Sequence, residues 1–266
     1  MIAGDCLAVM RDMWPESADL VFGSPPYENA RTYGIDFCLS GQEWVDWMVS
    51  VVKESLRVCS GLVAFVVEGH TRNFRWSATP ALLMADLHRA GVNLRKPPAF
   101  HRVGIPGSGG PDWLRNDYEF IVCCSKGKLP WSDNTAMGHE PKYPPGGPPS
   151  YRRTATRVYR NGDTRVQGIV YTPPKKSNPG NVIHCTVGGG HMGHPLAHEN
   201  EAPFPESLAE FFIRSFCPPG GLVLDPFVGS GTTCAVAQKH GRRSIGIDIR
   251  LSQIKLAQLR LNPHIL

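Results

Sequence analysis

The sequence predicts an α/β protein in which helices cover both faces of a mostly parallel sheet. Strand-like and helix-like segments alternate over most of the 266 residues, and this alternation is typical of doubly wound α/β domains. The run GLVAFVVEG at 61–69 is continuously apolar, as expected of a strand that is buried on both faces. With 41% hydrophobic residues, the chain can form one substantial core with an inserted lobe.

The first half of the chain contains clearly periodic segments. Three strands are predicted, at 18–24, 61–69 and 117–127. Residues 41–59 carry apolar side chains at helical spacing and predict a helix. A second helix is predicted at 79–91, with Thr79 as its N-cap, Pro80 in its first turn and Gly91 at its end.

The strand predicted at 18–24 leads into the tetrapeptide Ser24-Pro25-Pro26-Tyr27. Proline cannot donate a hydrogen bond to a sheet, so the strand must end there. Two fixed φ angles also make the turn stiff. A stiff turn at the carboxyl end of a strand favours a site that holds a substrate group in one place. The alternative is a plain strand-ending turn.

A second strand-to-turn junction lies near residue 225. Asp225 ends an apolar strand, 226–231 form a glycine-containing turn, and Thr232 opens a helix. The turn lacks the Lys-Ser/Thr pair of a P-loop, so phosphate binding is not indicated. The carboxylate of Asp225 could pair with an ammonium group, and Asp248 could accept hydrogen bonds from ribose hydroxyls. A ligand with an amino acid part and a ribose fits these residues better than a dinucleotide.

Residues 126–199, between the two junctions, show no sustained period and are rich in proline and glycine. Much of the formal net charge of +5 lies in this segment, where basic residues alternate with tyrosines. So long an irregular stretch is normally functional or mobile. Its charge and aromatic content favour DNA contact over a merely solvated loop. The candidate DNA-binding residues are Arg152, Arg153, Arg157, Arg160, Arg165, Lys175 and Lys176.

Neither a metal site nor a disulfide framework is predicted. The eight cysteines contain no CxxC pair, which is typical of buried free thiols in a reducing compartment. One cysteine and four histidines, spread over residues 184–198, match no common zinc motif. The amino terminus does not resemble a signal peptide, and no apolar run reaches membrane-spanning length.

These motifs resemble those of the S-adenosylmethionine-dependent DNA methyltransferases that modify exocyclic amino groups. SPPY at 24–27 resembles the catalytic motif, and DPFVGSGTT at 225–233 resembles the cofactor loop. APFPESLAEFF at 202–212 resembles the segment that precedes this loop, and GDCLAVM at 4–10 resembles a short motif near the cofactor adenine. The order, with the catalytic motif first, is similar to that of the beta class, in which the intervening segment recognises the target.

The resemblance implies a seven-stranded, mostly parallel, Rossmann-like methyltransferase sheet with an irregular target-recognition insert. The catalytic half would span 1–125, the insert 126–199 and the cofactor-binding half 200–266. The implied cofactor is S-adenosyl-L-methionine. The residues implied to contact it are Asp5, Cys6, Phe204, Asp225, Pro226, Phe227, Gly229, Ser230, Gly231, Thr232 and Asp248.

The implied reaction transfers a methyl group to an exocyclic amine of a base flipped out of double-stranded DNA. The lone pair of that amine is delocalised into the ring, so hydrogen-bond acceptors must draw on its protons. The Ser24 side chain and the Pro25 carbonyl can accept them, while Pro26 stiffens the turn and Tyr27 can stack on the base. Serine in this motif favours cytosine N4, with adenine N6 as the alternative, because the adenine enzymes usually carry an acid or asparagine there.

Two further interpretations remain open, namely RNA methylation by the same chemistry and a non-catalytic DNA-binding module. The resemblance also implies a cytoplasmic protein of a prokaryote or phage, with no membrane partner, and a connection to restriction-modification. The target sequence is not indicated. The sequence also does not indicate the oligomeric state, although a homodimer is possible, or whether a partner restriction nuclease exists.

Overall fold

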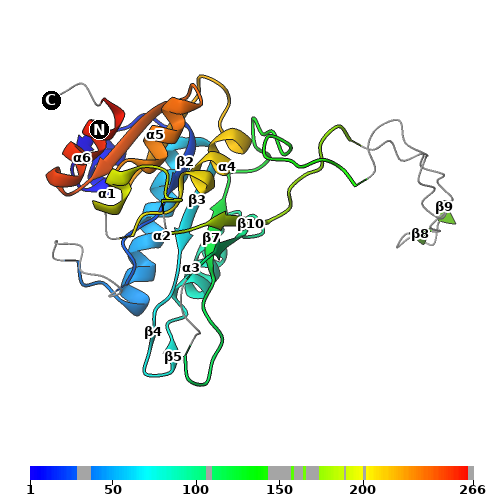
Figure 1. Ribbon diagram of the computed structural model, residues 1–266, viewed down its shortest axis with the longest axis horizontal. Coiled ribbons are helices and arrows are strands. Elements are labelled where there is room, and N and C mark those ends of the chain that lie inside the picture. Colours follow the sequence, from blue (N-terminus) through cyan, green and yellow to red (C-terminus); the bar gives the residue numbers. More distant parts are fainter. Residues whose placement is uncertain are drawn as a thin grey trace.

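Figure 1 presents the protein as a computed structural model. The structure describes residues 1–28, 37–105, 110–142, 157–158, 164–165, 174–188, 190–199 and 202–262. Within this part of the chain, no helix is both long enough and apolar enough to cross a membrane.

An eight-stranded sheet lies at the centre of the fold, in the order β1-β12-β11-β2-β3-β7-β6-β10. Its strands are β1 (Ile2–Ala3), β2 (Ala18–Gly23), β3 (Cys59–Val67), β6 (Ala99–Val103), β7 (Tyr118–Cys124), β10 (Val182–Thr186), β11 (Leu222–Asp225) and β12 (Arg243–Asp248). All of them run parallel except β7, which is antiparallel to both of its neighbours. Two small hairpins accompany the sheet, one of β4 (Thr71–Arg72) and β5 (Arg75–Trp76), the other of β8 (Arg157–Val158) and β9 (Thr164–Arg165).

The predicted strand number of seven is wrong, because residues expected to be irregular contribute an eighth strand. Strand β10 lies within 126–199 and pairs in parallel with β6 at the edge of the sheet. It buries Ile183 and Cys185 and exposes the residues between and beside them. Five alternating residues flanked by prolines and glycines give too short a pattern to stand out in the sequence.

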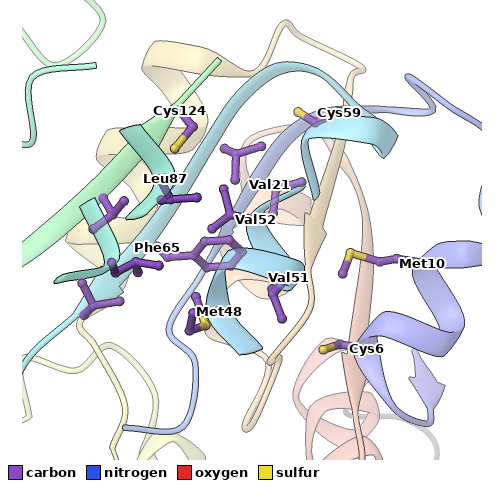
Figure 2. Packing of buried hydrophobic residues seen from close by; sticks show 14 of the residues in the cluster. Cys6, Met10, Val21, Met48, Val51, Val52, Cys59, Phe65, Leu87 and Cys124 are labelled. Carbon is purple, nitrogen blue, oxygen red and sulfur yellow. The ribbon is translucent and has the colours of Figure 1, made fainter. Parts of the chain in front are cut away.

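Helices cover both faces of the sheet, which confirms the predicted doubly wound architecture. They are α1 (Cys6–Arg11), α2 (Gly41–Val58), α3 (Thr79–Arg89), α4 (Glu206–Phe216), α5 (Thr232–Lys239) and α6 (Leu251–Leu261), with a short 3₁₀ helix at Pro195–Glu199. Alternate side chains of β2 and β3 point to opposite faces. Val21 and Phe65 join a cluster with α1, α2 and α3 (Figure 2), whereas Leu20 and Phe22 join a second cluster with α4 and α5.

Helix α3 begins at Thr79, but the predicted N-cap role of this residue is wrong. The capping position is Ala78, and no side chain caps the helix there. The Thr79 hydroxyl instead donates to the carboxylate of Glu28 over 3.1 Å in a buried setting. A buried carboxylate requires donors, so this hydroxyl is committed to the tertiary contact. Pro80 in the first turn and Gly91 with φ +76° just beyond the helix agree with the prediction.

The topology brings the two strand-ending turns together. Strands β2 and β11 are parallel neighbours, with Leu20 beside Val223, so their carboxyl ends lie at the same edge of the sheet. The chain continues from β2 to β3 on one side and from β11 to β12 on the other, which makes their boundary a topological switch point. Ligands of doubly wound proteins bind outside the carboxyl ends of the strands at such a point.

Candidate active site

A cavity of about 280 Å³ opens where the two strand-ending turns meet. Its lining is formed by Gly4, Asp5, Cys6, Ser24, Pro25, Pro26, Phe37, Cys38, Leu39, Trp47, Ala202, Pro226, Phe227, Gly229, Asp248, Ile249 and Arg250. The Ser-Pro-Pro turn after β2 and the glycine turn after β11 therefore face one shared space. Several of these residues, Trp47 and Arg250 among them, were not predicted, because they come from a helix and a loop that carry no motif.

Six of the predicted cofactor contacts lie in this lining, namely Asp5, Cys6, Pro226, Phe227, Gly229 and Asp248. Among the described residues, the other five predicted contacts lie outside it, namely Phe204, Asp225, Ser230, Gly231 and Thr232. The two groups differ in what their side chains contact.

The aromatic residues divide between the cavity and the core. The Phe227 ring packs against Trp47, with centroids 5.6 Å apart, and against Phe65 at 6.0 Å. Phe227 therefore lines the cavity with a ring that is supported from behind by other aromatic side chains. Phe204 instead packs edge-on against Phe22, with centroids 5.4 Å apart, in the cluster on the opposite face of the sheet from α2.

Asp225 supports the glycine turn from beneath. Its side chain is 2% exposed, and its Oδ1 accepts a hydrogen bond from the Phe227 amide over 3.0 Å. Burial raises the pKa of Asp225 to about 7. A Cβ placed on Gly23 would collide with the Asp225 carboxylate, so the ends of β2 and β11 touch through this pair. This contact is the reason for glycine at the end of β2.

Asp248 joins the glycine turn to the end of β12. Its Oδ2 accepts from the Gly229 amide over 3.1 Å, and its Oδ1 accepts from the Arg250 amide over 2.8 Å. Arg250 Nε lies 3.3 Å from the same Oδ1. Gly229 has φ +46°, a conformation that favours glycine. Asp248 thus fixes the backbone on which a ligand would rest while itself lining the cavity.

The remaining turn residues pack against α6 rather than the cavity. The Thr232 hydroxyl accepts from Arg260 Nη1 over 2.9 Å, and Arg260 Nη2 donates to Glu206 over 2.6 Å. Gly231 has φ +83°, and a Cβ there would lie 3.0 Å from the Cβ of Ala257. Ser230 is 1% exposed. These contacts hold the start of α5 in place.

The catalytic-motif turn is held by a chain of hydrogen bonds. Ser24 Oγ lies within donating distance of Tyr27 Oη at 3.2 Å and of the Val66 carbonyl at 3.3 Å. Tyr27 Oη in turn donates to Glu119 Oε2 over 2.8 Å. The Pro26 carbonyl accepts from the indole of Trp44 over 2.9 Å. Tyr27 itself is half-buried beside the cavity lining.

Glu119 and its partner Arg102 were missed by the sequence reasoning. Glu119 is 8% exposed, and its Oε1 lies 3.0 Å from Arg102 Nη1. The two residues come from the neighbouring strands β7 and β6. A single acid within the apolar strand YEFIVCC was the available signal, since an acid that is buried normally has a partner.

The predicted DNA-binding residues are placed only in part. Lys175 and Lys176 are exposed. Arg157 and Arg165 are paired partners in the β8–β9 hairpin. Arg152, Arg153 and Arg160 lie outside the described residues. Their predicted contacts with DNA stay predictions.

The DNA methylase family matches residues 18–259. The chain belongs to this family. It is therefore a DNA methyltransferase that uses S-adenosyl-L-methionine and acts on exocyclic amino groups, as the motifs predicted.

Curated relatives of this DNA methylase match almost its whole length. It is 27% identical over 267 residues to the DNA adenine methyltransferase YhdJ of Escherichia coli K12, covering 98% of this chain and 82% of the relative. It is 25% identical over 295 residues to the type II methyltransferase M.PvuII of Proteus hauseri, covering 98% of this chain and 82% of the relative.

Solved structures share the fold. The cytosine-N4-specific PvuII DNA methyltransferase superposes with a TM-score of 0.71 at 20% identity, over 100% of this chain and 87% of that one. A DNA modification methylase of Thermus thermophilus, in complex with S-adenosyl-L-methionine, superposes with a TM-score of 0.61 at 21% identity, over 98% of this chain and 93% of that one.

Proposed function

We propose that the protein methylates the exocyclic amine of a base flipped out of duplex DNA, with cytosine N4 as its target. The observation that carries the proposal is the shared cavity. Ser24 and Pro25 line it from one turn, while Gly229 and Asp248 line it from the other. An amine held at the first turn would meet a methyl donor seated at the second, and such positioning can supply most of the catalysis for an already activated sulfonium.

The lining residues suit the methyl donor. The aromatic ring of Phe227 in the lining suits contact with the adenine of the cofactor. A carboxylate has about four lone-pair sites, so Asp248 retains acceptor capacity beyond its bonds to Gly229 and Arg250. A ribose hydroxyl could use that capacity. When bound, S-adenosyl-L-methionine supplies an electrophilic methyl group, and the role of these residues is to hold it in place.

The hydrogen bonds around Ser24 set the direction of its proton. Tyr27 commits its own proton to Glu119, a carboxylate that is ion-paired with Arg102. The Tyr27 oxygen is then an acceptor for the Ser24 proton, as is the Val66 carbonyl. With its single proton directed at either of them, the Ser24 oxygen turns its lone pairs toward an incoming amine. When this oxygen accepts a hydrogen bond from the amine, the nitrogen lone pair becomes more available for the methyl group.

Cytosine N4 is the preferred target because Ser24 stands where adenine enzymes usually carry an acid or asparagine. Adenine N6 is the second candidate, and the observation that favours it is the match to the DNA adenine methyltransferase of Escherichia coli. Both amines present two protons and a delocalised lone pair, so the acceptor arrangement at Ser24 serves either.

Residues 126–199 are proposed to recognise the target, because they carry the basic residues between the two halves of the site. Strand β10 within this segment belongs to the main sheet. Recognition is therefore assigned to the parts before and after β10, including Lys175 and Lys176.

The test is to incubate the purified protein with unmethylated duplex DNA and methyl-labelled S-adenosyl-L-methionine, then identify the labelled nucleoside by mass spectrometry. N4-methylcytosine is expected, and N6-methyladenine would support the second candidate. Ser24→Ala should bind the cofactor with unchanged affinity by calorimetry yet lose most of the transfer. Label in RNA but not in DNA, or cofactor binding with no transfer to any nucleic acid, would contradict the proposal.

A further inference from the structure

The β4–β5 hairpin projects from the body of the protein just beyond the carboxyl end of β3 (Figure 1). This is the edge of the sheet at which the cavity opens. At its tip, Phe74 is 80% exposed. Large aromatic side chains bury about 150–250 Å² when they pack, so an almost fully exposed one forgoes most of that stabilisation.

The backbone at the tip is strained. Asn73 has φ +50° and Phe74 has φ +61°. Two successive positive φ angles are typical of the type I′ turn, which normally carries glycine at its second position. A bulky L-residue in the left-handed region costs about 1–2 kcal/mol. The backbone conformation at Phe74 is therefore unfavourable, and its exposed ring gains little stabilisation from packing. Strain of this kind clusters at functional sites.

Two arginines flank the aromatic tip. Arg72 and Arg75 are exposed and face each other across the hairpin, and neither has an ion-pair partner among the described residues. Like charges directly opposite each other destabilise a strand pair. The residues of β4, the turn and β5 include no acid. An aromatic tip between two unpaired cations fits a polyanion with stacked bases.

The base of the hairpin is fixed to the catalytic edge. The Trp76 indole donates to Glu68 over 3.2 Å, and the Ser77 amide donates to the His70 carbonyl over 2.8 Å. A Cβ on Gly69 would collide with the Ser77 carbonyl, so the two arms pack closely there. Glu68 lies two residues after Val66, whose carbonyl lies 3.3 Å from Ser24 Oγ. The hairpin is thus a rigid extension of the strand that helps to hold the catalytic turn.

We propose that this hairpin enters the DNA duplex beside the target base, with Phe74 as a wedge and Arg72 and Arg75 on the neighbouring phosphates. The inference rests on the proposed function, in which duplex DNA is the substrate. Apolar wedges inserted between base steps compensate for part of the stacking lost when a base leaves the helix. A two-stranded ribbon is also narrow enough for the major groove.

The experiment compares duplex DNA with the same DNA as separated single strands. A wedge is needed only where a base must leave a duplex. Phe74→Ala should lower the single-turnover methylation rate on duplex by about tenfold, which corresponds to about 1.4 kcal/mol, and should leave the single-strand rate within about twofold of wild type. Phe74→Trp should retain the duplex rate. The control is Trp14→Ala, since Trp14 is 83% exposed and precedes the amino end of β2.

The charged flanks give a second measurement. Arg72→Ala and Arg75→Ala should each reduce the slope of log affinity against log salt by about 0.9. A wild-type duplex rate for Phe74→Ala, or an equal loss of rate on duplex and single strands, would overturn the proposed role of Phe74 as a wedge. Unchanged salt slopes for both arginine variants would overturn the proposed phosphate contacts. A wild-type protein that methylates no DNA would instead overturn the proposed function on which the inference rests.

Discussion

The hydroxyl of Tyr27 donates to the carboxylate of Glu119 over 2.8 Å and so ties the turn at 24–27 to the antiparallel strand β7. Glu119 is also ion-paired with Arg102, so one oxygen of its carboxylate contacts the arginine and the other accepts the hydrogen bond from the tyrosine. The bond fixes the position of the Tyr27 ring. It also orients the tyrosine oxygen to accept from Ser24.

Tyr27→Phe should therefore reduce the methyl-transfer rate, because Ser24 loses an acceptor that directs its proton away from the amine. Loss of one such hydrogen bond corresponds to about a tenfold change. Glu119→Ala should reduce the rate in the wild type but add little in the Tyr27→Phe background, since both act through the same bond. The measurement is single-turnover kinetics for the two single variants and the double variant.

Cofactor affinity separates this role from a general disturbance of the fold. Calorimetry should give a wild-type affinity for S-adenosyl-L-methionine in all three variants, because neither side chain lines the cavity among the described residues. Glu43→Gln, at an exposed acid on α2, serves as the matched control. Additive losses from the two single variants would refute the proposed coupling.

The residues that sequence reasoning identified are those whose chemistry is visible in a short stretch of chain. Proline after an apolar strand must end it, and glycines after Asp225 must turn the chain, so both turns were found. Their meeting follows from parallel pairing of β2 with β11. The burial of β2 and β3 on both faces likewise follows from their uninterrupted apolar runs.

What escaped prediction depends on contacts across the sheet. Glu119 meets Tyr27 only because β7 inserts antiparallel between β3 and β6, and no local pattern specifies that order. Asp225 was expected to face a ligand, but burial against Gly23 places it below the turn. In β10 the strand period is present, but five residues are too few to identify it.

Gly23→Ala should destabilise the protein because the added methyl group meets the Asp225 carboxylate. Overpacking of this kind costs about 1–3 kcal/mol, and the displaced carboxylate should also weaken cofactor binding by disturbing the Phe227 amide. Chemical denaturation measures the first effect and calorimetry the second. Gly127→Ala is the control, since no atom lies within 4 Å of a Cβ built there. Equal stability of the two variants would contradict the expected clash.

Asp225→Asn should change how the free energy of unfolding depends on pH. Burial raises the pKa of Asp225 from 3.8 to about 7 in the folded protein. The folded state therefore binds more protons than the unfolded state between these values. The contribution of this group to stability is present below about pH 4 and is lost as the pH rises toward 7. Asparagine does not ionise, so the Asp225→Asn variant should not show this loss of stability with rising pH.

Denaturation of both proteins at about pH 5 and about pH 8 isolates the effect, because all other groups titrate alike in the two. The free energy of unfolding of Asp225→Asn minus that of wild type should be larger at the higher pH than at the lower pH, by on the order of 1–3 kcal/mol. Parallel stability profiles for the two proteins would show that the carboxyl titrates normally.

Lys175 and Lys176 are exposed in the segment assigned to target recognition, and we expect them to contact DNA phosphates. Each neutralised phosphate releases counterions, so the double variant with both lysines changed to alanine should lower the slope of log affinity against log salt by about 2. Fluorescence anisotropy with unrelated duplexes measures it. Lys53→Ala, at an exposed position on α2, should leave the slope unchanged. Phosphate contacts carry no sequence information, so affinity for all duplexes should fall together. A loss confined to one sequence would mean that these lysines read bases instead.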